Sequence, residues 1–118
     1  MPTSNQYQPN DCYELIATIT SGQTTSGEID LSGADLCGLF IPATFDGTTV
    51  TITASPISGG TFVTVQSAGA DYTLTTTASK YCPIENLAVV AGLRFIKLVA
   101  GTAQSTTDTI ITLAARPI

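Results

Sequence analysis

The stretch "LCGLFIPATFDGTTVTITAS", residues 36–55, joins two kinds of hydrophobic pattern. It begins as an apolar run, Leu36 to Ile41, which ends at Pro42, and the turn signal Asp46–Gly47 follows. Residues 48–55 then alternate, with threonine at the odd positions and apolar residues at the even positions from 49 to 54. The alternation predicts a strand with one buried and one solvated face. The apolar run predicts a strand covered by a second sheet on one face and by a loop or a neighbouring subunit on the other.

Short strands separated by Gly, Pro, Ser or Asp are predicted along most of the chain. We expect a hairpin that joins residues 61–66 to residues 71–77 across "SAGA", and one helical turn near residues 85–89. Other strands are predicted at residues 13–19, 26–31, 93–101 and 109–118. About eight short strands without a long amphipathic helix predict an all-β fold, an antiparallel β-sandwich of jelly-roll type.

The length of 118 residues fits a single domain. We expect residues 13–118 to form that domain and residues 1–12 to form an extended N-terminal arm, because Pro2 and Pro9 disfavour a helix there. The arm is expected to be either a frayed terminus or a segment that lies on a partner subunit. The sequence shows neither an apolar stretch long enough for a transmembrane helix nor the apolar region of a signal peptide.

Charged residues make up 11% of the chain, less than half the usual share of about 25%. Threonine, with 21 copies, supplies much of the polar surface instead. The formal net charge is −5, and the four cations form no cluster. Because binding to nucleic acids or anionic membranes needs clustered Lys and Arg, we expect neither as a partner.

Catalytic chemistry is not expected, because the chain has no histidine and its nine acids are scattered. Glu28 and Asp30 lie two residues apart on one predicted strand, which could suit a glycosidase-like pair or a calcium ion, but a solvated strand face is favoured. Asp46 and Asp71 follow turn patterns and are expected to cap backbone amides. The sequence therefore predicts no enzyme and no catalytic, cofactor or metal site.

The three cysteines, Cys12, Cys37 and Cys82, are widely spaced and have no histidine to complete a zinc site. Free thiols in a reducing compartment such as a bacterial cytoplasm are favoured. A single bridge, Cys12–Cys82 or Cys37–Cys82, stays open as an alternative.

A carbohydrate-binding module is the main alternative from the residues, since small β-sandwiches often bind sugars on exposed aromatic rings. The chain has no tryptophan, so tyrosines are the candidate platforms, and the phenylalanines are expected to pack in the core. The tyrosines are Tyr7, Tyr13, Tyr72 and Tyr81, and the phenylalanines are Phe40, Phe45, Phe62 and Phe95.

Three segments resemble a group of small structural proteins of tailed bacteriophages. An "LxGLxxP" motif at Leu36–Pro42 leads into a threonine-rich strand, and a "GTF" strand entry at Gly60–Phe62 follows. The pattern closes with "RFIKL" at Arg94–Leu98, a "GT" turn and a final "ITL" strand at Ile111–Leu113. Members of this group usually carry a tryptophan where this chain has Phe45. The strand at residues 93–101 also resembles one in galactose-binding-like jelly rolls.

The phage resemblance implies a virion component, most simply a capsid decoration (cement) protein that binds the outer surface of the assembled shell and stabilises it. Its partners would be the major capsid protein and further copies of itself, as a homodimer or homotrimer. The resemblance also allows a head fibre base, a neck protein or a tail protein. An acidic chain is repelled by packaged DNA, so we expect an outer position on the capsid and assembly in the host bacterial cytoplasm.

Overall fold

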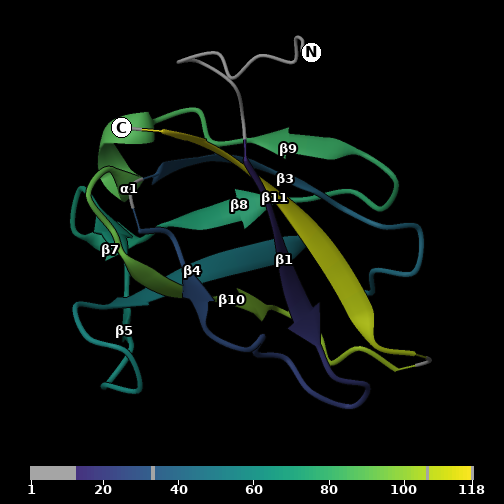
Figure 1. Cartoon of the computed structure of the whole chain (residues 1–118). Coiled ribbons are helices and arrows are strands. Elements are labelled where there is room, and N and C mark those ends of the chain that lie inside the picture. Colours follow the sequence, from purple (N-terminus) through teal and green to yellow (C-terminus); the bar gives the residue numbers. More distant parts are fainter. Residues whose placement is uncertain (1–12, 33, 106, 118) are drawn as a thin grey trace, which may run out of the picture.

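The computed structural model describes residues 13–32, 34–105 and 107–117, which form two main antiparallel sheets packed face to face (Figure 1). The four-stranded sheet has the order β1 (Tyr13–Ile19), β11 (Thr109–Pro117), β3 (Ala34–Phe40) and β9 (Tyr81–Pro83). The five-stranded sheet has the order β2 (Ile29–Asp30), β10 (Phe95–Ala100), β4 (Thr49–Ser55) and β5 (Val63–Thr64), and β8 (Thr73–Thr75) also pairs with β4. A short hairpin of β6 (Gln66–Ser67) and β7 (Ala70–Asp71) and the helix α1 (Leu87–Val90) complete the described elements.

The order of the strands confirms the predicted all-β sandwich and gives it jelly-roll connectivity. The chain alternates between the two sheets from β1 to β4, contributes β5 and β8 to the five-stranded sheet on either side of the separate β6–β7 hairpin, and alternates again from β9 to β11. Eight strands carry this pattern, and β5, β6 and β7 are short additions within the β4–β8 connection. Both termini of the sandwich therefore belong to the four-stranded sheet, where β1 pairs with β11 along its whole length.

The core lies between the sheets and is built from alternate positions of the facing strands. On β4 the even positions Val50 and Ile52 are fully buried while the threonines between them are half-buried, as the alternation predicts. Each fully buried side chain of this size contributes about 1.5–3 kcal/mol to folding. The other large, fully buried apolar side chains are Ile19, Leu31, Leu36, Leu39, Val90, Ile96, Leu98, Ile111 and Leu113.

The predicted hairpin of residues 61–66 and 71–77 forms only at its tip. There β6 pairs with β7 around Ala68 and Gly69, both of which have positive φ as a tight two-residue turn requires. The two arms then separate, and both pair with the same edge of β4. β5 lies beside Thr53 and Ala54, whereas β8 lies beside residues 49–51. The separation is favourable because β4 is long enough to satisfy the backbone of both short strands.

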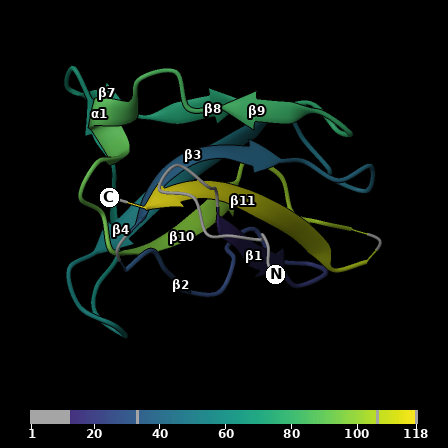
Figure 2. The same ribbon diagram turned by 45° about the horizontal axis from the view of Figure 1, so that its top comes forward.

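The strands β8 and β9 are consecutive in the chain but belong to different sheets, and Figure 2 shows them on the same side of the sandwich. Only residues 76–80 connect them. The helix α1 follows β9 after three residues and confirms the predicted helical turn near residues 85–89, although it begins two residues later and ends one residue later. The side of the sandwich that carries β8 and β9 also holds one of the two candidate surfaces.

Candidate functional surfaces

The carboxylates of Glu28 and Asp30 bind different partners. Glu28 precedes β2 and accepts hydrogen bonds from the Ser58 hydroxyl at 2.6 Å and from the neighbouring backbone N–H at 2.8 Å. These two bonds lower the pKa of Glu28. Asp30 accepts a bond from the Ser32 N–H at 2.8 Å and faces the Arg94 guanidinium at 3.4 Å. Glu28 therefore binds the turn at residues 58–59, whereas Asp30 binds Ser32 and Arg94.

Asp46 caps a backbone amide as predicted, although the amide belongs to a distant loop. Its carboxylate accepts bonds from the N–H and the hydroxyl of Ser105, both at 2.9 Å, and these bonds lower the pKa of Asp46. The neighbouring Gln104 is fully buried, and its carbonyl oxygen accepts bonds from the Asp46 N–H and the Thr109 hydroxyl. Within the described part of the chain the Asp71 carboxylate makes no hydrogen bond, so the capping prediction is wrong there.

Cys37 and Cys82 are both free thiols, so the alternative Cys37–Cys82 bridge is not formed, and Cys12 lies outside the described residues. The Cys82 thiol donates to the Thr75 carbonyl at 3.5 Å. Burial, and secondly the charge of Glu85, raises the pKa of Cys82. A thiol that stays protonated at neutral pH is a poor nucleophile and a poor metal ligand. The residues that the structure describes contain no cluster of His, Cys, Asp and Glu that could hold a metal ion.

The outer face of the four-stranded sheet carries an exposed row of apolar side chains. The register places Ile16, Thr112, Phe40 and Tyr81 side by side across all four strands, and Ile110 lies in the next row. The exposed fractions are 61% for Ile16, 51% for Phe40, 50% for Ile110 and 44% for Tyr81. We call this surface, the residues Ile16, Phe40, Tyr81 and Ile110, the apolar face. Contiguous exposed apolar side chains of this kind mark contact surfaces more often than chance.

Phe40 was expected in the core, and the structure places it on the apolar face instead. Its ring packs against Tyr81 with ring centroids 4.6 Å apart. The Tyr81 ring in turn covers Gly38, where a side chain would collide with its hydroxyl end. Within this chain the outer face of β3 is thus covered at Gly38 by Tyr81 and left open at Phe40, where cover by a neighbouring subunit stays a prediction. Phe40 points out of the sheet beside Tyr81, its partner on β9, and its side chain stays half exposed.

The other three phenylalanines lie closer to the prediction. Phe45 and Phe95 are buried, and the guanidinium of Arg94 covers the Phe95 ring at 4.8 Å. Phe62 is half-buried under the Lys97 ammonium, which lies 4.5 Å from the ring centroid. The outward-facing apolar positions of β10 and its neighbourhood are therefore covered by long cationic side chains, as is common for Lys and Arg.

Ile16 and Ile110 were not identified by sequence reasoning, although a signal for Ile16 was present. On β1 the inward face is formed by alternate residues that include Ala17 and Ile19. Ile16 occupies a position of the opposite phase, where a solvated strand normally carries a polar residue. Ile110 is likewise an apolar residue at an outward position of β11, because the buried, inward positions of that strand include Ile111 and Leu113.

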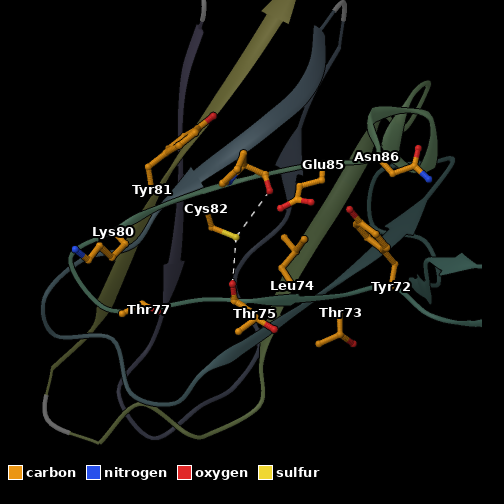
Figure 3. Close-up of a pocket in the computed structure, with 11 residues that line it drawn as sticks. Tyr72, Thr73, Leu74, Thr75, Thr77, Lys80, Tyr81, Cys82, Glu85 and Asn86 are labelled. Atoms are coloured by element: carbon orange, nitrogen blue, oxygen red, sulfur yellow. Dashed lines mark hydrogen bonds between the residues drawn. The ribbon is translucent and has the colours of Figure 1, made fainter.

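The second candidate surface is a groove of about 440 Å³ between β8 and β9 (Figure 3). The five-stranded sheet supplies one wall, and β9 with the segment leading into α1 supplies the other. Its volume falls within the range of about 300–1,000 Å³ that is usual for small-molecule sites. The groove is lined by Tyr72, Thr73, Leu74, Thr75, Thr77, Lys80, Tyr81, Cys82, Pro83, Glu85 and Asn86.

Two of the predicted sugar platforms, Tyr72 and Tyr81, line this groove, but their rings point different ways. Figure 3 shows Tyr72 at one end with its hydroxyl directed toward Glu85 and Asn86, whereas the Tyr81 ring is directed out of the groove. Tyr7 and the side chain of Tyr13 lie outside the described residues. Glu85 and Asn86 had not been connected with Tyr72, because their proximity depends on how the two sheet edges meet.

Comparison of the chain with protein-family models, with curated proteins and with solved structures gives no match. None of the described helices is long and apolar enough to cross a membrane.

Proposed function

We propose that this chain is a bacteriophage virion structural protein, a capsid decoration protein that binds the outer surface of the assembled shell. The observation that carries the proposal is the apolar face, to which each of the four strands of one sheet contributes an exposed apolar side chain, whereas threonines line the outer face of β4, β5 and β8 in the other sheet. The sequence resemblance to small phage structural proteins agrees with it. Jelly rolls are used by viral capsid and lectin domains, which supports the proposal by analogy of fold.

The size of the apolar face suits repeated, individually weak contacts. Four strands about 4.8 Å apart and about three residues along each strand give an area on the order of 200 Å². A stable one-to-one complex buries about 800 Å² on each partner. A contact of the smaller size is sufficient on a shell that offers the same site many times, particularly if two or three linked copies bind together. The proposed occupant of the apolar face is therefore the major capsid protein.

The remaining features fit an external position on the particle. The net charge of −5 disfavours contact with packaged DNA and favours the outer surface of the shell. The free thiols of Cys37 and Cys82 fit assembly in the reducing cytoplasm of a bacterial host. Binding only to the assembled shell would stabilise that state by mass action, without any catalytic step.

The test is the occupancy of the protein on purified virions of the phage that encodes it. A fixed ratio of this chain to the major capsid protein supports the proposal, and virions that lack the chain should be less stable to heat. A few copies per particle would instead indicate the head fibre base, neck or tail. Absence of the chain from virions would overturn the proposal.

Two matched variants test which surface makes the attachment. Ile110→Lys places a charge on the apolar face, and Thr64→Lys places the same charge on the outer face of the other sheet, where the residue is also exposed. We expect Ile110→Lys to reduce occupancy at least about tenfold, because burying an unpaired charge costs more than the 1.4 kcal/mol that a factor of ten requires. Equal occupancy of the two variants would contradict the assignment of the apolar face.

A further inference from the structure

We propose that the groove between β8 and β9 binds a neutral saccharide at its Tyr72 end, away from Tyr81, the residue that the groove shares with the apolar face. The polar groups of the groove converge at one end, where Tyr72, Glu85 and Asn86 lie close together around the apolar side chain of Leu74 (Figure 3). This inference does not rest on the proposed attachment to a shell.

The hydrogen-bonding groups at this end of the groove are unused. Within the part of the chain that the structure describes, the side chains of Tyr72, Glu85 and Asn86 make no hydrogen bond. Asn86 is the N-cap residue of α1, a position at which asparagine usually caps, yet its side chain makes no capping bond. A phenol, a carboxylate and an amide together can both donate to and accept from the hydroxyls of a sugar.

The charges of the groove favour a neutral ligand. Glu85 and Lys80 are its only charged lining residues in the described chain, and they lie toward opposite ends, with Cys82 between them (Figure 3). An anion would be repelled at the Tyr72 end, and the single carboxylate there gives no cluster for a metal cation. A pyranose suits the site, because its C–H face can pack on the half-buried Tyr72 ring while its rim hydroxyls reach the polar groups.

The groove is suited to binding rather than to cleavage of a sugar. Glycoside hydrolysis needs two carboxyl groups on either side of the scissile bond. Of the described residues that line the groove, Glu85 alone carries a carboxylate. The half-buried Cys82 thiol, whose pKa is raised by burial, does not supply a replacement nucleophile.

The test is an NMR titration of the isotope-labelled full chain with the methyl glycosides of glucose, galactose, mannose and N-acetylglucosamine. We expect millimolar binding of at least one glycoside, with shifts confined to the amides of residues 72–75 and 85–88. Glycerol serves as the control for nonspecific polyol effects. No shift with any glycoside, or equal shifts with glycerol, would overturn the proposal.

Three variants localise the binding. Glu85→Gln and Asn86→Ala each remove one hydrogen-bonding partner, and we expect each to weaken binding about five- to tenfold. Lys80→Ala lies at the opposite end of the same groove and should bind as the unmodified chain does. Unchanged affinity in both Glu85→Gln and Asn86→Ala would overturn the site. Virion occupancy of these variants should stay unchanged, so a failure here is distinct from a failure of the decoration proposal.

Discussion

The two sheets bury similar inner faces, but their outer faces carry different side chains. On the four-stranded sheet the outer face presents the apolar residues described above. On the five-stranded sheet the corresponding positions form a threonine face, in which Thr51 and Thr73 place their hydroxyl oxygens 3.2 Å apart across β4 and β8. The threonine face consists of Thr49, Thr51, Thr53, Thr64, Thr73 and Thr75.

The contrast shows that the fold alone does not demand an apolar outer surface. Threonine has a high preference for strands and keeps a hydroxyl in water. It therefore suits the outer face of the five-stranded sheet without making that face apolar. The same residue type would serve equally well at Ile16 and Ile110, which are exposed and contribute little to the core. The apolar side chains at those positions are therefore best explained by a contact with another molecule.

The largest expected effect is a difference in unfolding free energy between substitutions on the inner and outer faces of β3. Leu39 is fully buried and Phe40, the next residue, is half exposed. We expect Leu39→Ala to lower the free energy of unfolding by about 2–5 kcal/mol, because it leaves a cavity. Phe40→Ala should cost about 1 kcal/mol, the value of its contact with Tyr81. Urea unfolding measures both. Equal losses would mean that the apolar face is part of the core.

A second prediction concerns how the apolar face is held in place. Gly38→Ala would put a methyl group where the Tyr81 ring lies, so the ring must leave β3 and its contact with Phe40 must break. We expect a loss of about 1 kcal/mol in unfolding free energy, since the displaced group is the end of an exposed side chain. A change in tyrosine fluorescence should accompany it. Gly27→Ala, where a methyl group meets open space, is the control. An unchanged Tyr81 environment would contradict the packing.

The fold could be predicted from the sequence because its signals are local. The alternation at residues 49–54 specifies which side of β4 is buried, and turn residues such as Gly47 separate the strands. One domain of short alternating strands leaves few architectures other than a sandwich or barrel. The jelly-roll connectivity followed from that spacing and from the number of strands.

The surfaces could be predicted only in part, because they depend on pairing between distant segments. Phe40 lies beside Tyr81 only because β3 pairs with β9, which lies about 40 residues further along the chain. The end of the groove brings Tyr72 next to Glu85 and Asn86 only because β8 and β9 lie in different sheets. Neither fact is encoded in the periodicity of a single strand.

A smaller effect is expected on the threonine face. Thr51→Val and Thr73→Val each remove one hydroxyl of the pair across β4 and β8. Each variant should change the unfolding free energy by less than about 0.5 kcal/mol, because valine suits a strand as well as threonine does. A double-mutant cycle should give a coupling of about 0.2–1 kcal/mol, the usual value for a cross-strand pair. A coupling near zero would show that water satisfies both hydroxyls equally well.

The smallest expected effect is on the pH dependence of stability. It concerns Glu28 and Asp46, which lie in the loops before β2 and β4, whereas the four residues of the apolar face include no carboxylate. Hydrogen bonds lower the pKa of Glu28 below its ordinary 4.5 and the pKa of Asp46 below its ordinary 3.8. Each bonded carboxylate therefore stabilises the fold above its ordinary pKa, and this contribution is lost as the pH falls through the lowered value. We expect thermal unfolding of Glu28→Gln and Asp46→Asn to depend less on pH between about 5 and 2. Asp71→Asn, which removes a carboxylate without such bonds, is the control. If all three variants lose the same acid dependence, net charge rather than these hydrogen bonds governs it.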